Sequence, residues 1–233
     1  MSDSNQPLET NPSRPGATRS FIPEENERPV ILSLMKDIPN IVTLLGLSSG
    51  VLGIYFALVE NFPAAIIAML WAVLFDWYDG IVARRIPGRS DILKSVGAKM
   101  DSLVDIVSLA ICPAVILLSY GNFSGWFFPG ALAIVMAGVV RLAYFDIFGV
   151  DKDGTIAGLS LDITPFIVAL VFLLEGVLDH GAFAVFLYTI IVVLSFLHVA
   201  PFRMYKMVGR WYYAITAYIL IMTAVYAFIL WTN

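Results

Sequence analysis

Residues 64–85 read AAIIAMLWAVLFDWYDGIVARR, an apolar run that ends in two aspartates and two arginines. About 20 apolar residues are enough for a helix to cross a bilayer, so the run is a candidate membrane helix with a charged end. The rest of the chain has the same character. Of its 233 residues, 59% are hydrophobic and 14% are charged, and the mean hydropathy is +0.84. This composition is not that of a soluble globular domain.

Apolar windows predict seven spans, at about residues 41–59, 64–79, 101–118, 126–145, 163–178, 182–198 and 212–231. The sequence therefore predicts an all-α membrane protein, a polytopic transmembrane helix bundle. In this arrangement all 14 Lys and Arg residues fall on the side of the N-terminal segment. The positive-inside rule makes that side, and the N-terminus with it, cytoplasmic. An odd number of spans brings Thr232 and Asn233 out on the opposite face.

The chain divides into three predicted regions. Residues 1–28 are polar and rich in Pro, Ser and Asn, which indicates a disordered cytoplasmic tail. Residues 29–37, PVILSLMKD, fit either an interfacial helix or a flanking segment of the first span. Residues 38–233 form the transmembrane domain. Cys112 is the single cysteine, which excludes an intrachain disulfide and a cysteine-based metal site.

Four aspartates are predicted to gather at one end of two adjacent helices. Asp76 and Asp79 lie three residues apart at the end of one span, on one side of a helix that turns about 100° per residue. Asp101 and Asp105 follow at near-helical spacing at the start of the next span. Four carboxylates near a membrane boundary repel one another unless cations neutralise them. Hard oxygen ligands of this kind suit Mg²⁺, Mn²⁺ or Ca²⁺, which can also bridge the oxygens of a pyrophosphate.

The same residues carry a family resemblance. Asp76-x-x-Asp79-Gly80-x-x-Ala83-Arg84, twelve residues, then Gly97-x-x-x-Asp101-x-x-x-Asp105 resembles the signature of the CDP-alcohol phosphatidyltransferases at all eight fixed positions. Eight ordered positions are far more specific than a lone glycine motif. The resemblance implies a six-helix core, here with a seventh span, and makes residues 38–233 a transmembrane catalytic domain.

The resemblance also implies the site residues. Asp76, Asp79 and Asp101 would bind two divalent metal ions, either Mg²⁺ or Mn²⁺. Asp105 would act both as a metal ligand and as the base that accepts the alcohol proton. The CDP moiety would be bound by Gly80, Ala83, Arg84, Gly97, Asn40 and Thr43. The resemblance further implies a homodimer, and no nucleic-acid partner is expected.

The acceptor alcohol is predicted from looser similarity. DSLVDIVSLAICPAVILLSY at residues 101–120 and RLAYFD at residues 141–146 are similar to the phosphatidylserine synthase branch. A serine site needs a basic residue to bind the carboxylate and an acidic residue to bind the ammonium group. Arg141 and Asp146 are the candidates. Alternatively, Arg141 pairs with one of the signature aspartates.

The predicted reaction is transfer of a phosphatidyl group from CDP-diacylglycerol to the L-serine hydroxyl, with release of CMP, at the cytoplasmic face of the membrane. A sister transferase using glycerol 3-phosphate, inositol phosphate or another alcohol remains an alternative. A proton- or ion-coupled transporter and a non-catalytic scaffold are alternatives from other classes.

Two further features receive structural interpretations. Asp162 is expected to be a helix N-cap, and the basic run from Arg84 to Lys99 a solvated loop in which Arg84 alone has a specific role.

Overall fold

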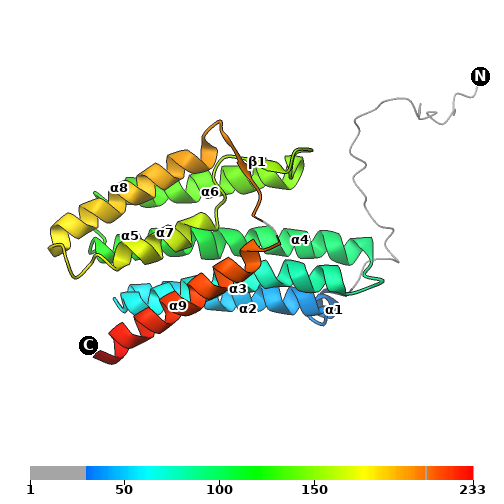
Figure 1. Ribbon diagram of the computed structural model, residues 1–233, viewed down its shortest axis with the longest axis horizontal. Helices are drawn as coiled ribbons and strands as arrows, with labels where there is room; N and C mark the ends of the chain where they lie inside the picture. Colours follow the sequence, from blue (N-terminus) through cyan, green and yellow to red (C-terminus); the bar gives the residue numbers. More distant parts are fainter. Residues whose placement is uncertain (1–29, 208, 233) are drawn as a thin grey trace, which may run out of the picture.

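The computed structural model describes residues 30–207 and 209–232 as a bundle of helices with a small sheet at one end (Figure 1). The predicted tail, residues 1–28, lies outside the described residues. The elements, in chain order, are α1 (Ile31–Leu34), α2 (Ile38–Leu58), α3 (Phe62–Arg85), α4 (Asp91–Asp105), η2 (Ile106–Ile111), α5 (Cys112–Tyr120), α6 (Phe128–Phe148), β1 (Thr155–Ala157), α7 (Ile163–Phe172), α8 (His180–Val199), β2 (Arg203–Tyr205) and α9 (Trp211–Thr232).

Six helices in the described ranges are long and apolar enough to cross a membrane. They are α2, α3, the continuous 30-residue helix Asp91–Tyr120, α6, α8 and α9. The predicted polytopic helix bundle is thereby confirmed. The span predicted at residues 163–178 differs, because its helix α7 has only 10 residues. At 1.5 Å per residue such a helix is about 15 Å long, roughly half the hydrocarbon thickness.

The α7 segment nevertheless joins the two ends of the bundle. At its start, the Thr164 hydroxyl lies 2.8 Å from Nε2 of His198, near the end of α8. At its end, the Phe172 ring packs 5.2 Å from the ring of Phe183, near the start of α8. The described part of the chain therefore passes between the two ends seven times, and α1 and the end of α9 lie at opposite ends of the bundle (Figure 1).

Some of the helices, α3 and α8 among them, begin where the sequence supplies a capping side chain. The Asn61 side chain accepts a hydrogen bond from the Ala64 N–H at the start of α3, and Pro63 occupies the first turn, where its missing N–H costs nothing. The Asp179 side chain accepts in the same way from the Ala182 N–H at the start of α8. These local signals fix where α3 begins, and the helix carries Asp76 and Asp79 in its second half.

The helix after the site contains a π-helical turn. Within Asp91–Tyr120, η2 starts directly after Asp105 and ends just before Pro113. Proline has no N–H for the ladder and its ring crowds the preceding turn, so a wider turn ahead of it relieves both problems. The wide turn fits closely against α2, where a Cβ on Gly50 would lie 2.3 Å from the Ser108 hydroxyl oxygen.

A short sheet adds to the predicted all-helical fold. β1 and β2 pair antiparallel with Thr155 opposite Tyr205, Ile156 opposite Met204 and Ala157 opposite Arg203. The pair joins the α6–α7 connection to the α8–α9 connection and lies at the site end.

The segment before the first long helix holds the four-residue α1. Its apolar side chains are unusually exposed, with Ile31 at 83% and Leu32 at 66%. An interfacial helix over residues 29–37 stays a prediction, because no membrane is present and residue 29 lies outside the described ranges.

Candidate functional site: three converging carboxylates and two cavities

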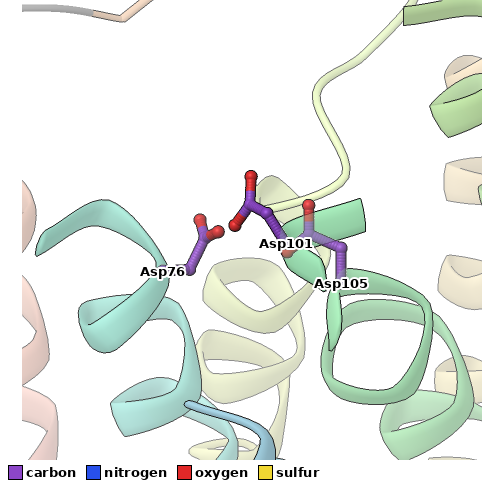
Figure 2. Close-up of side chains that lie close together, drawn as sticks. All are labelled: Asp76, Asp101 and Asp105. Carbon is purple, nitrogen blue, oxygen red and sulfur yellow. The ribbon is translucent and has the colours of Figure 1, made fainter. Parts of the chain in front are cut away.

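Three aspartates from two neighbouring helices converge on one another (Figure 2). Asp76 projects from α3, while Asp101 and Asp105 project from successive turns of α4, and one carboxylate oxygen from each lies within 4.8 Å of the others. All three side chains are partly buried. The helical spacing of Asp101 and Asp105 puts both on the same face, opposite Asp76.

Asp79, the fourth predicted ligand, lies beside this cluster and has its own partner. One carboxylate oxygen accepts a hydrogen bond from the Thr43 hydroxyl of α2. Asp79 is only 8% exposed, and Thr43 is also buried. The hydroxyl orients the carboxylate and satisfies one of its oxygens, so Asp79 keeps a second oxygen for another ligand.

The donor set fits a divalent cation. Three carboxylates this close are all acceptors when ionised, so they repel one another and need a cation between them. Carboxylate oxygens are the ligands that Mg²⁺, Mn²⁺ and Ca²⁺ prefer, and no sulfur or imidazole ligand belongs to the group. Asp76, Asp101 and Asp105 would hold the ion, with Asp79 at the edge of the site.

A cavity of about 260 Å³ opens beside the three carboxylates. Its polar lining includes the four aspartates, Arg84, Arg141, Ser160, Asp162, Lys206 and Tyr212. Ile156 of β1 and Met204 of β2 also line it, so the small sheet forms part of its wall.

A second cavity, of about 440 Å³, lies on the other side of Asp79. Its lining contains all six residues that the resemblance assigns to CDP: Asn40, Thr43, Gly80, Ala83, Arg84 and Gly97. Asp79, Gly80, Arg84 and Asp101 line both cavities. A ligand with a polar head in the second cavity and a phosphate near Asp79 would therefore reach the carboxylate cluster.

Gly97 leaves space for two side chains of the second cavity. A Cβ at this position would lie 2.6 Å from Nη2 of Arg89 and 3.0 Å from Oδ1 of Asn40. These two atoms are themselves 3.2 Å apart, with Arg89 donating to Asn40. The amide of Asn40 is fixed further because its Nδ2 donates to the Leu34 carbonyl oxygen at 3.0 Å.

Arg89 is a residue whose role the sequence interpretation missed. Its Nη2 lies 2.5 Å from a carboxylate oxygen of Asp37, and the two side chains are 7% and 10% exposed. Arg89 also donates from Nη2 to the Leu93 carbonyl oxygen at 3.2 Å. The expectation that the run from Arg84 to Lys99 is solvated, with Arg84 alone specific, is therefore wrong for Arg89. A signal was available, since the dipeptide Pro87-Gly88 directly before Arg89 is typical of a turn, and in the structure Gly88 has a φ of +71°.

Arg84 lies at the junction of the two cavities and is held by the last helix. Its Nη2 donates to the Tyr212 hydroxyl of α9 at 2.9 Å. The Tyr212 ring in turn packs edge-on to Trp77, with ring centroids 5.1 Å apart. The last helix thus contributes a residue to the site, which the signature between residues 76 and 105 could not reveal.

The two predicted acceptor residues are separated. Arg141 lines the first cavity, where its Nε donates to the Leu159 carbonyl oxygen at 3.0 Å. Asp146 instead accepts from Lys99 at 2.6 Å and from Ser102 at 2.7 Å, and it does not line that cavity. Within the described residues Arg141 forms no ion pair with a signature aspartate, so the alternative pairing is not observed.

Asp162 is the second residue whose role was missed. It precedes α7, as expected of an N-cap, but its side chain makes no capping hydrogen bond. Its Oδ2 accepts from the Trp77 indole N–H at 3.0 Å, while its buried Oδ1 has no hydrogen-bond partner among the described residues. The side chain lines the cavity that holds the carboxylate cluster. Its N-cap position disguised this orientation in the sequence.

Comparison with known proteins points to the same family that the aspartate signature resembles. The chain is 40% identical over 116 residues, 47% of each chain, to archaetidylserine synthase of Methanothermobacter thermautotrophicus. Two proteins named CDP-diacylglycerol–serine O-phosphatidyltransferase also match. The one from Methanocaldococcus jannaschii is 35% identical over 48% of this chain and 50% of its own length, and the one from Bacillus subtilis is 28% identical over 48% and 63%.

The chain spans about half the length of the first of these curated relatives. The family pattern described as CDP-alcohol phosphatidyltransferase covers much more of it, matching residues 36–232. The match includes the last helix, which lies outside the similarity noted from the sequence alone. The chain belongs to the CDP-alcohol phosphatidyltransferase family.

Proposed function

We propose that this chain transfers a phosphatidyl group from CDP-diacylglycerol to the hydroxyl of L-serine, forming phosphatidylserine and CMP. The observation that carries the proposal is the junction of the two cavities. Three converging carboxylates line one cavity, all six predicted CDP contacts line the other, and Asp79 and Arg84 line both. The names of the similar proteins favour serine as the acceptor.

The residues have distinct proposed roles in binding the donor. Asn40, Thr43, Gly80, Ala83 and Gly97 would surround the cytidine and its ribose in the second cavity. Arg84, at the junction, would contact the pyrophosphate, because a guanidinium presents several N–H donors to phosphate oxygens. The acyl chains would stay in the bilayer between the helices.

Asp76, Asp79, Asp101 and Asp105 would hold two Mg²⁺ or Mn²⁺ ions. When bound, such ions neutralise the pyrophosphate charge and stabilise the departing phosphate oxygen. The serine hydroxyl oxygen attacks the phosphorus that carries the diacylglycerol. The bond from this phosphorus to the bridging oxygen of CMP breaks, and CMP leaves. Asp105 accepts the hydroxyl proton, and no covalent enzyme intermediate forms.

Arg141 would bind the serine carboxylate, since it lines the same cavity as the carboxylate cluster. Asp146 remains the acid predicted from the sequence, although its carboxylate is engaged by Lys99 and Ser102.

The site end is proposed to face the cytoplasm. The α3–α4 connection and β2 carry Arg89 and Arg203, whereas the connections at residues 59–61, 121–127 and 173–179 carry no Lys or Arg, and the positive-inside rule associates basic residues with the cytoplasmic side. The homodimer stays a prediction from the family resemblance, to be tested by native mass spectrometry in detergent.

The test is an acceptor panel on the purified full chain. Labelled serine, glycerol 3-phosphate, inositol and inositol phosphate are each supplied with Mn²⁺ or Mg²⁺ and either CDP-diacylglycerol or its archaeal ether-lipid counterpart. We expect incorporation of serine, abolished by Asp105→Asn. Incorporation of another acceptor would keep the reaction and replace the substrate, whereas no metal-dependent CMP release with any acceptor would refute the proposed function and return attention to transport or scaffolding.

A further inference from the structure

Asp162 lines the cavity beside the carboxylate cluster and carries a buried oxygen that is unpaired within the described part of the chain. The residue is 9% exposed, and its Oδ1 has no partner among the described residues. Its Oδ2 is fixed by the Trp77 indole N–H at 3.0 Å, so the carboxylate cannot easily rotate away from the cavity. A buried acceptor without a partner is unfavourable in a folded protein unless a ligand or water donates to it.

Arg141 presents the opposite charge to the same cavity. It is 7% exposed and is held by its Nε donating to the Leu159 carbonyl oxygen and by the Phe145 ring, whose centroid lies 5.2 Å from the guanidinium carbon. Its terminal nitrogens make no hydrogen bond to any residue in the described ranges. No ion pair joins Arg141 to Asp162 within those ranges, so the two side chains face the same cavity without direct contact.

We propose that Asp162 and Arg141 together form the receptor for a zwitterionic amino-acid acceptor, with Asp162 binding its ammonium group and Arg141 its carboxylate. This inference rests on the proposed function and deepens it, because it assigns the specificity of the acceptor site. The ammonium donates to the unpaired Oδ1 of Asp162, and the guanidinium donates to the carboxylate in a forked arrangement. The hydroxyl then points toward Asp105, which lines the same cavity.

The inference moves the acidic role from Asp146 to Asp162. Asp146 is already paired with Lys99 and Ser102 and lies outside the cavity lining. Two competing roles for Asp162 also exist. It could be an additional metal ligand beside Asp105, or it could serve only to hold Trp77.

The central variant is Asp162→Asn, which keeps an oxygen that can accept from the Trp77 N–H but removes the charge that an ammonium requires. Asp179→Asn makes the same chemical change at the far end of the bundle, where asparagine caps a helix as well as aspartate does. Serine binding is measured with labelled L-serine in the presence of Mn²⁺ and CMP, which allows no turnover. Transfer is measured with serine and with glyceric acid, in which a hydroxyl replaces the ammonium.

For Asp162→Asn we expect at least a tenfold loss of serine binding and a similar rise in KM for serine. The preference for serine over glyceric acid should fall by a comparable factor. Arg141→Lys should also weaken serine binding, because lysine cannot make the forked contact. Asp179→Asn should behave as wild type. Thermal stabilisation by CDP-diacylglycerol with Mn²⁺ should persist in every variant, which shows that each is folded and binds the donor.

Three results would overturn the inference. Unchanged serine binding with a weakened response to Mn²⁺ would make Asp162 a metal ligand. Unchanged binding of both serine and Mn²⁺ would leave it a support for Trp77. Loss of serine binding in Asp146→Asn but not in Asp162→Asn would restore the assignment made from the sequence. Failure of the proposed function is distinguishable, because wild-type protein would then bind no serine and transfer nothing to it.

Discussion

The buried pair of Arg89 and Asp37 offers a sharp test of the architecture around the second cavity. Arg89→Ala removes a guanidinium that is 7% exposed and leaves the Asp37 carboxylate, 10% exposed, without its cation. Removing one partner of a buried ion pair costs about 3–5 kcal/mol. For a chain of this size each kcal/mol lowers Tm by about 2–4 °C, so the expected fall is about 6–20 °C.

The assay is thermal unfolding of purified protein in detergent, with Arg85→Ala as the matched control. Arg85 is exposed, and surface substitutions usually change stability by less than about 0.5 kcal/mol. The double variant Arg89→Ala/Asp37→Ala should be less destabilised than the sum of the two single variants, because it leaves no unpaired charge. A Tm for Arg89→Ala equal to that of Arg85→Ala, or strict additivity in the double variant, would refute the reasoning.

Two further predictions concern fixed contacts near the site. Thr43→Val removes the hydroxyl that donates to Asp79, and a hydrogen bond to a charged group is worth about 1.5–3 kcal/mol. The affinity for CDP-diacylglycerol, measured by the thermal stabilisation that it induces, should therefore fall by about 10- to 150-fold. Thr43→Ser should retain the wild-type affinity, and an unchanged affinity in Thr43→Val would contradict this role of the hydroxyl. Gly158→Ala should lower Tm more than a typical surface substitution does, because Gly158 has a φ of +67° and an added Cβ would lie 2.2 Å from the His198 carbonyl oxygen. An unchanged melting curve would contradict this close contact between Gly158 and His198.

The helices and the helix faces that carry the aspartates were predictable because they depend on local periodicity. Asp101 and Asp105 lie one turn apart, so their shared face follows from helical geometry alone. The apolar runs likewise predicted every long membrane helix. At residues 163–178 apolar composition indicated a full span, but the helix stops at Phe172 and the rest of the segment forms turns.

The missed site residues depend on contacts between distant parts of the chain. Arg89 meets Asp37 across 52 positions, and Asp162 meets Trp77 across 85. Periodicity gives the face of a helix but not the partner across the bundle, so Asp146 was chosen over Asp162 for the acceptor site. In the structure the carboxylate of Asp146 is engaged by Lys99, and the unpaired oxygen belongs to Asp162.

The central claim is that the converging carboxylates hold the divalent ion required for phosphatidyl transfer. The most direct measurement is a Mn²⁺ titration of the purified chain followed by electron paramagnetic resonance, comparing wild type with Asp76→Asn and Asp101→Asn. The account predicts saturable binding in wild type and its loss, or a weakening of at least tenfold, in both variants. Mn²⁺ binding that is unchanged in the two variants would contradict it.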